Sequence, residues 1–224
     1  MFTLPAPARR EPLRRRFCAD SYLALPGLIS PSGLAELAGE ARRLEADAVR
    51  RDFDMPSMAD SPRHMTTLGG HRIARTSPLI TRLYQDPDLI RLLSSLLGET
   101  AVTVHDPVER HVLNILHRPG DTHGGHTDDY PLALVLFLEA PPHPADGGLL
   151  EFHPGRGDLA ALDAPGTRHV HHRPGDGYLL RSDLTAHRVT PLARPGPRRT
   201  VLNFAYTTPG RQGAITDSAS LLYD

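Results

Sequence analysis

The sequence contains no lysine: all 25 basic residues in this chain of 224 are arginine. This absence excludes a lysine Schiff base, a phosphate-binding P-loop lysine and any other chemistry of an amine side chain. Cysteine is almost absent too, because Cys18 stands alone and has no partner for an internal disulfide. A chain without disulfides is typical of a reducing compartment, so we predict a cytoplasmic protein.

An excess of one charge and long apolar runs are also missing. The formal net charge is −1, which gives no electrostatic reason to expect a nucleic-acid partner. No apolar run approaches the ~18 residues of a membrane-spanning helix. The N-terminal segment MFTLPAPARREPLRRRF lacks the apolar core of a signal peptide. We therefore predict neither a nucleic acid nor a membrane as a partner.

Length and composition indicate one globular domain. Hydrophobic residues make up 39% and charged residues 23% of the chain, as in ordinary globular proteins. We divide the chain into an arm over residues 1–20, a helical layer over 30–98, a core of strands over 99–208 and a tail over 209–224. The polar segment 52–72 within the helical layer is predicted to be a mobile loop that closes over a site as a lid.

Two segments of the helical layer carry clear helix signals. Apolar residues recur at helical spacing after Ser30 and Ser32, and either serine would serve as the N-cap of a helix that runs to about Arg51. A second helical patch covers residues 78–84 and 86–97, where an Asp-Pro pair opens the longer helix and a glycine closes it.

After residue 98 the sequence changes to short strands bounded by Gly, Pro or Asp. The strand segments are AVTVHDPVERHVLNILH, PLALVLFLEA, GGLLEFHPG, GDGYLLRSD, HRVTPL and TVLNFAYTT. Behind a helical layer, this pattern predicts a mainly β fold with N-terminal helices. The expected architecture is an antiparallel double-stranded β-helix, a cupin-like jelly roll with helices packed on one of its two sheets.

The densest cluster of potential metal ligands is RPGDTHGGHTDDY, residues 118–130. His126 and Asp128 are two residues apart there, and on an extended backbone this spacing puts both side chains on one face. His187, which opens a later strand, is the best-placed third ligand. Two histidines and one carboxylate leave the opposite face of an octahedral ion open, as in non-haem Fe(II) oxygenases. Taken alone, the His-x-Asp spacing fits a surface turn equally well.

The order of the signals favours the metal site. His-x-Asp is followed by strands, then by HRVTP, and then by Arg198 and Arg199 at the head of another strand. Over residues 100–207 this order resembles the Fe(II)/2-oxoglutarate-dependent oxygenases. The resemblance implies Fe(II) on the triad, 2-oxoglutarate and O₂ as co-substrates, and a strand arginine that holds the far carboxylate of 2-oxoglutarate. Because neighbours on a strand face opposite ways, one of the two arginines has this role, and RTVLNFAY favours Arg199.

That last segment belongs to a narrower resemblance, to the radical halogenases and hydroxylases of free amino acids such as lysine. The matching segments are RDFDMPSMADSPRHMTT, LITRLYQDPDLIRLL, VERHVLNILHRPGDTHGGHTDDY, HRVTPL and RTVLNFAY. In the halogenases of the group, glycine replaces the carboxylate of the triad and chloride binds the iron in its place. This chain has Asp128 at that position, so the resemblance implies hydroxylation.

The same resemblance implies a substrate pocket. Glu109 and Asp129 match two carboxylates that hold the side-chain ammonium of a basic amino acid. Arg63, His123 and Asn203 match groups that hold the carboxylate end of that amino acid. Charge-assisted hydrogen bonds of both kinds are chemically sound.

Without the resemblance, these residues have plainer interpretations. Glu109 next to an arginine fits a solvated ion pair, and Arg63 in a polar loop fits a solvent-facing side chain. Asp129 fits the cap of a turn, and His123 fits a group that orients the loop of the metal ligands.

Two further positions are compared with the same group of enzymes. Ala205 stands where the group has a substrate contact with a hydroxyl, and Tyr223 corresponds to a C-terminal aromatic of the group. The run His169-x-His171-His172 suggests a metal site, but adjacent histidines on a strand point to opposite faces, so we predict that it lies on the surface. We predict a surface position for His111 as well.

We therefore predict a hydroxylase that uses Fe(II), 2-oxoglutarate and O₂ on an unactivated C–H bond of a free, cationic amino acid, lysine or ornithine, with release of succinate and CO₂. Two alternatives remain open. A cupin-type metalloenzyme that does not use 2-oxoglutarate would have no need for the arginine pair. A non-catalytic jelly roll that binds an amino acid or a partner protein need not keep the triad intact.

Overall fold

The computed structural model describes residues 1–213 and 216–224. Its helices are α1 (Pro7–Asp20), α2 (Pro31–Glu45), α3 (Gly70–Thr76), α4 (Pro78–Tyr84), α5 (Pro87–Leu97) and α6 (Asp217–Tyr223), with short 3₁₀ turns η1 (Pro56–Met58), η2 (Pro144–Asp146) and η3 (Leu159–Asp163). Its strands are β1 (Tyr22–Leu25), β2 (Val49–Met55), β3 (Ser61–Leu68), β4 (Val102–Thr103), β5 (His111–Leu116), β6 (Thr122–His126), β7 (Leu132–Glu139), β8 (Leu150–Phe152), β9 (Arg168–Val170), β10 (Gly177–Leu180), β11 (His187–Val189) and β12 (Arg199–Thr207).

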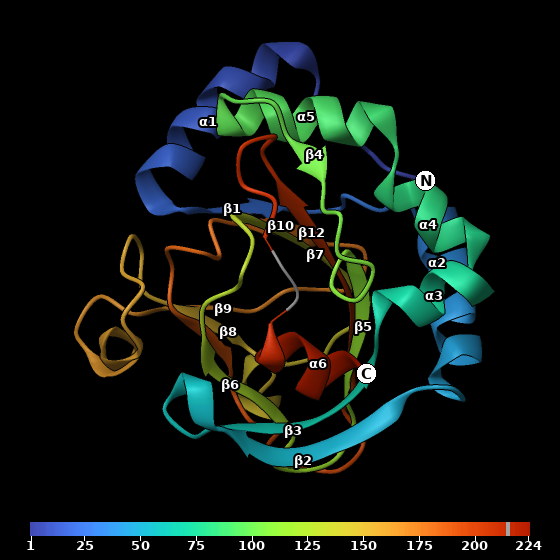
Figure 1. Cartoon of the computed structure of the whole chain (residues 1–224), viewed down its shortest axis with the longest axis vertical. Coiled ribbons are helices and arrows are strands. Elements are labelled where there is room, and N and C mark those ends of the chain that lie inside the picture. Colours follow the sequence, from blue (N-terminus) through green and yellow to red (C-terminus); the bar gives the residue numbers. More distant parts are fainter. Residues whose placement is uncertain (214–215) are drawn as a thin grey trace.

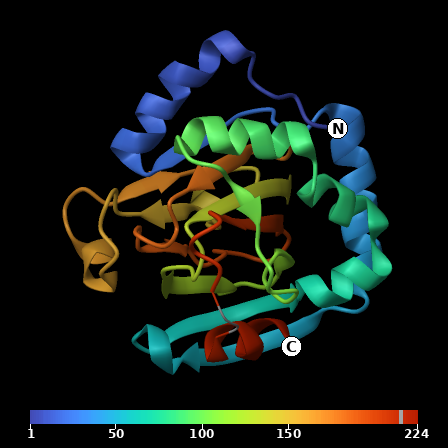
Figure 2. The ribbon, with the colours of Figure 1, turned by 45° about the horizontal axis from the view of Figure 1, so that its top comes forward.

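The strands form one curled antiparallel sheet in the order β1-β10-β7-β12-β5-β3-β6-β11-β8-β9, with β2 paired to β3 and β4 paired to β12. Helices α1, α2, α4 and α5 cover one side of the roll, while β2, β3 and α6 lie at the opposite end (Figure 1). The turned view in Figure 2 shows the curled sheet beneath α1 and α5, with β2, β3 and α6 on its far side. The predicted mainly β fold with N-terminal helices is confirmed.

The predicted helices at 78–84 and 86–97 are confirmed as α4 and α5. The carboxylate of Asp86 accepts hydrogen bonds from the backbone N–H groups of Asp88 and Leu89, both at 2.9 Å, and so caps α5. Gly98 ends the helix with a φ of 81°, a left-handed conformation that glycine adopts without strain.

Helix α2 begins as expected and ends early. The hydroxyl of Ser30 accepts a hydrogen bond from the backbone N–H of Gly33 at 3.2 Å, which identifies Ser30 as the N-cap. The helix ends at Glu45 rather than near Arg51, because residues 49–55 pair with β3 as strand β2. Pairing in the sheet therefore overrides the helical periodicity of this segment.

Two predictions for the N-terminal half were wrong. The arm over residues 1–20 contains helix α1, which packs on α5 and buries Phe17 in the core shared by the helices and the sheet. Its arginines favour a helix, but one fully buried side chain leaves almost no apolar periodicity to detect. The lid loop at 52–72 is a hairpin of β2 and β3 instead, and β3 also pairs with β5 and β6. Backbone pairing on both sides of β3 excludes a free lid here.

Strands β7 and β12 separate two apolar cores. The even-numbered residues of β7 (132–138) and of β12 (202–206) pack against the helices. The odd-numbered Phe137 and Val201 face the inside of the roll. Both faces of these strands are covered, which explains their continuous apolar sequence. The parity of β12 directs Arg199 and the other odd-numbered side chains into the roll.

The C-terminal segment predicted as a tail contains α6, which packs on β3. The hydroxyl of Thr67 donates a hydrogen bond to the carbonyl of Leu222 at 2.6 Å. None of the helices in the described part of the chain has the length and apolar character needed to cross a membrane.

Candidate active site

The two strands that carry the histidines of the proposed triad are neighbours. Strand β6 pairs with β11 so that His126 lies opposite His187, while Val189 lies opposite His123. Two steps along β11 therefore correspond to three along β6, which is a β-bulge of one residue. The bulge turns His123 and His126 to the same inner side, where their rings stack at 4.0 Å between centroids.

Two glycines let neighbouring segments approach this bulge closely. A Cβ on Gly124 would lie 2.7 Å from Pro62 of β3, and a Cβ on Gly125 would lie 3.1 Å from Leu162 of η3. A side chain at Gly124 would therefore push β6 away from β3. The HGGH sequence thus combines two inward-facing histidines with two positions where neighbouring segments approach closely.

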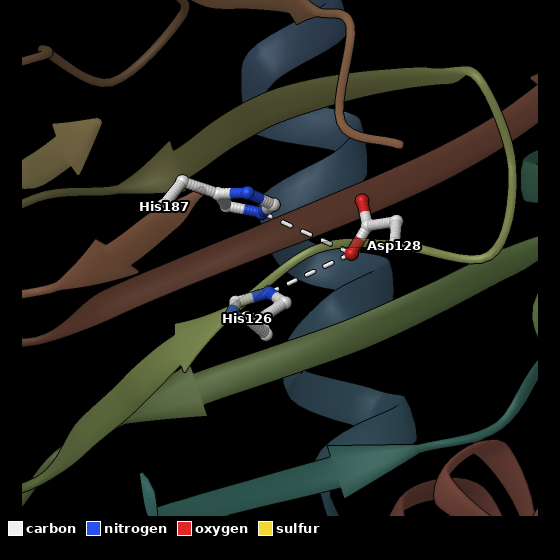
Figure 3. A group of neighbouring side chains, drawn as sticks. All are labelled: His126, Asp128 and His187. Carbon is white, nitrogen blue, oxygen red and sulfur yellow. Dashed lines mark ion pairs between the residues drawn. The ribbon is translucent and has the colours of Figure 1, made fainter. Parts of the chain in front are cut away.

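His126, Asp128 and His187 meet inside the roll (Figure 3). Oδ1 of Asp128 lies 3.6 Å from Nε2 of His126 and 3.8 Å from Nε2 of His187. Their potential ligand atoms all lie within 4.8 Å of one another. Two donor atoms each ~2.1 Å from one ion lie at most ~4.2 Å apart, so the two imidazole–carboxylate distances suit a shared metal ion.

Each of the two histidines uses Nδ1 for a hydrogen bond, so its Nε2 is free and faces the space between the three side chains. Nδ1 of His126 donates to the carbonyl of Gly124 at 2.7 Å, and Nδ1 of His187 donates to the carbonyl of Thr185 at 2.9 Å. Each Nε2 therefore carries a lone pair. Burial, reinforced by His123, holds the pKa of His126 well below its ordinary value, so this imidazole is neutral, as a metal ligand must be.

The adjacent arginines have opposite surroundings. Arg199 is 4% exposed, and its guanidinium lies 5.0 Å above the ring of Phe137. Its Nε has no hydrogen-bond partner among the described residues, and burial lowers its pKa. Arg198 points outward and forms ion pairs with Glu45 at 2.8 Å and Glu139 at 3.3 Å. Of the two, only Arg199 faces the inside of the roll with its charge uncompensated.

All five residues predicted to bind substrate line two adjoining cavities next to the triad. One cavity is lined by Arg63, Glu109, His123 and Asp129, and the other by Glu109 and Asn203. Arg63 is fully buried rather than solvent-facing, because β3 carries it inside, opposite His123 in the register. The hydrogen bonds that NH1 of Arg63 donates go to Ser61 and Pro62.

The carboxylates of the first cavity concentrate negative charge. Burial, reinforced by Asp129 and Asp128, raises the pKa of Glu109 to about 9. Asp129 lies exposed at the rim, and its Oδ2 accepts a hydrogen bond from the hydroxyl of Thr216 at 2.7 Å. A cation bound between Glu109 and Asp129 would restore the ionised form of Glu109.

Sequence reasoning missed the aromatic surroundings of Arg199. His172 and His111 were predicted on the surface, and both are buried. His172 stacks on Phe137 at 4.5 Å between ring centroids, and the hydroxyl of Tyr22 lies 2.9 Å from its Nε2. His172 follows the end of β9, so the parity of that strand does not apply to it. The aromatic residue in the strand GYLL hinted at an aromatic side chain near Arg199, but nothing in the sequence pointed to His172.

Solved structures with the same fold include non-haem, α-ketoglutarate-dependent enzymes. The α-ketoglutarate-dependent epimerase SnoN from nogalamycin biosynthesis is 21% identical, with a TM-score of 0.72 over 91% of this chain and 82% of its own. A prolyl-4-hydroxylase from Pseudomonas putida is 16% identical, with a TM-score of 0.62 over 90% of this chain and 100% of its own. HygX from Streptomyces hygroscopicus, solved with nickel and 2-oxoglutarate, is 15% identical, with a TM-score of 0.65 over 88% of this chain and 87% of its own. The predicted oxygenase-type jelly roll is thereby confirmed.

The chain itself belongs to the halogenase D family, whose profile matches residues 6–217. No curated protein shows significant sequence similarity to it.

Proposed function

We propose that this protein is an Fe(II)- and 2-oxoglutarate-dependent hydroxylase of a free amino acid with a cationic side chain, lysine or ornithine. The observation that carries the proposal is the carboxylate of Asp128, which lies within 4 Å of Nε2 of both His126 and His187. In the halogenases that the chain resembles, glycine at this position leaves room for chloride. Here the carboxylate takes that room, which favours hydroxylation.

The described residues fit iron and 2-oxoglutarate. His126, Asp128 and His187 would hold the ion, and Arg199 would bind the far carboxylate of 2-oxoglutarate, because its buried charge has no carboxylate partner in the described part of the chain. SnoN has been solved with iron and α-ketoglutarate, which supports the assignment by analogy of fold. When bound, these groups supply the oxidation: O₂ converts 2-oxoglutarate to succinate and CO₂, and one oxygen atom enters a C–H bond of the substrate.

The protein contributes binding and orientation. Glu109 and Asp129 would hold the side-chain ammonium, and Arg63 with His123 would hold the carboxylate end. Burial lowers the pKa of Arg63 to about 10, so it stays protonated at neutral pH and favours an anionic group. When both ends of the amino acid are held in this way, one methylene group of its side chain lies beside the triad. The neighbouring methylene groups are then kept away from the reacting centre.

The test is product analysis with purified protein, Fe(II), 2-oxoglutarate and O₂, across the proteinogenic amino acids and ornithine. We expect succinate release with lysine or ornithine and a product heavier by one oxygen atom, even in high chloride. A chlorinated product would overturn the hydroxylase assignment. Equal turnover of leucine and lysine would overturn the cationic substrate, and no succinate with any amino acid would overturn the substrate class.

A further inference from the structure

Three buried oxygen atoms without partners line one cavity beside the triad. The cavity measures about 30 Å³, and its polar lining includes Glu109, Tyr130 and Asn203. Oε2 of Glu109, the hydroxyl oxygen of Tyr130 and Oδ1 of Asn203 are buried and have no hydrogen-bond partner among the described residues. Buried polar atoms are normally paired, so three unpaired oxygens at one place indicate a ligand that donates hydrogen bonds.

A primary ammonium group matches this set in number, charge and size. It donates three hydrogen bonds and accepts none, and three of the oxygens that line the cavity have no partner among the described residues. Asp128 of the triad and Tyr223 line the same cavity. Glu109 supplies the negative charge, while Tyr130 and Asn203 supply neutral acceptors. A cavity of about 30 Å³ holds a group of the size of water, whereas a guanidinium or a trimethylammonium group is larger. The apolar remainder of the lining includes Val112, Leu132 and Ala205.

The position of the Tyr130 hydroxyl is held by its surroundings. Tyr130 is 2% exposed, and its side chain packs with Val104 and Ala205. Its backbone carbonyl accepts a hydrogen bond from the hydroxyl of Ser182 at 3.1 Å. Gly213 lies against the edge of the ring, where a Cβ would be 3.6 Å from the nearest ring atom. The hydroxyl therefore cannot turn to solvent and stays beside Glu109.

We propose that Tyr130 is a specificity-determining residue whose hydroxyl, with Glu109 and Asn203, accepts the three N–H groups of the side-chain ammonium of the substrate. The site then binds amino acids with neutral or N-methylated side chains more weakly than lysine, because each missing N–H leaves one buried oxygen unpaired. The resemblance implied that Asp129 contacts the ammonium and that Asn203 contacts the carboxylate end. This inference assigns Oδ1 of Asn203 to the ammonium instead, and the exposed Asp129 then attracts the cation by its charge, without a hydrogen bond to it. The identity of the substrate rests on the proposed function.

The test compares binding without turnover, by calorimetry under anaerobic conditions with Fe(II) and 2-oxoglutarate present. Tyr130→Phe removes one oxygen and keeps the ring. We expect it to weaken the binding of lysine on the order of 10-fold, the effect of one hydrogen bond to a charged group, and to leave the binding of norleucine unchanged. The preference for lysine over Nε-methyllysine should narrow in the variant. Unchanged lysine binding, or an equal loss for lysine and norleucine, would overturn the inference.

Tyr206→Phe is the matched control. Tyr206 is also a buried phenol, but its hydroxyl donates to the carbonyl of Tyr84 at 2.7 Å, away from the cavity. We expect this variant to unfold at a lower temperature and to bind lysine like the unmodified protein. A loss of lysine affinity in Tyr206→Phe equal to that in Tyr130→Phe would assign the effect to general destabilisation and overturn the inference.

Turnover with O₂ separates the two proposals. Lysine binding with these preferences but without a hydroxylated product would reject the proposed reaction and keep the ammonium site. Hydroxylation of lysine together with unaltered binding by Tyr130→Phe would reject the site and keep the reaction. No lysine binding by the unmodified protein would reject both.

Discussion

Arg198 and Arg199 are chemically identical neighbours in opposite environments, so they form a matched pair for testing the 2-oxoglutarate site. Arg199 is 4% exposed and lies over Phe137, whereas the side chain of Arg198 is 33% exposed and paired with Glu45 and Glu139. A desolvated charged hydrogen bond contributes ~1.5–3 kcal/mol, which is about one to two decades in affinity. We therefore expect Arg199→Met to raise the KM for 2-oxoglutarate by about 10- to 100-fold and Arg198→Met to change it little.

The order of the two variants should be reversed for stability: the variant that binds 2-oxoglutarate more weakly should not be the less stable one. The charge of Arg199 is buried without a carboxylate partner among the residues described, and burial lowers its pKa. Replacing such a charge by an apolar side chain of similar volume is often neutral or stabilising. Arg198→Met loses exposed ion pairs, which contribute ~0.2–1 kcal/mol each. In the ligand-free protein, Arg199→Met should thus be at least as stable as Arg198→Met.

Two assays check this prediction. Succinate release at varied 2-oxoglutarate gives KM, and thermal unfolding with and without 2-oxoglutarate gives the ligand-induced stabilisation, which depends on the ratio of ligand concentration to Kd. Arg199→Met should lose that stabilisation, and Arg198→Met should keep it. A larger rise in KM for Arg198→Met would show that strand β12 presents its other face to the co-substrate. No change in either variant would remove the strand arginine from the site.

Four further outcomes are expected. His126→Ala should abolish turnover and weaken Fe(II) binding in calorimetry, because the triad loses one of its two imidazoles; full activity after chelation of the metal would contradict the assignment of the whole triad. Product mass spectrometry in high chloride should detect only hydroxylation while Asp128 is present, and any chlorinated amino acid from the unmodified protein would refute this reasoning. Glu109→Gln should raise the KM for lysine about 10-fold or more and leave that for leucine unchanged, since it removes the charge of a half-buried carboxylate; an equal effect on both would indicate a structural role. Burial lowers the pKa of His111 from 6.5 to about 4, so its neutral form stabilises the fold above pH 6.5. That stability should be lost as the pH falls toward 4, by about 3 kcal/mol at 1.36 kcal/mol per pH unit. Denaturant unfolding at pH 7 and pH 4 measures the loss, and His111→Gln should reduce it.

Local signals in the sequence predicted the features that depend on few adjacent residues. The Asp-Pro pair at the start of α5 and Gly98 at its end were sufficient to place that helix, because a cap satisfies backbone groups within one turn. The order of His-x-Asp, strands, histidine and arginine likewise led to the residues that the structure brings together at one site. A resemblance of motifs supplied the substrate residues, all of which line the two cavities.

Tertiary structure decided which way side chains face and what covers them. The helical periodicity before residue 51 gave way to strand β2 because β3 offered backbone partners. The bulge in β6, which turns His123 inward beside His126, exists only in the pairing with β11. Which of the two arginines faces the site depends on what lies on each side of β12. Helices pack on one face of this strand, and the other face lines the inside of the roll. Burial is a property of segments far apart in the chain that meet in space. For that reason the unpaired hydroxyl of Tyr130 has no signature in the sequence around it.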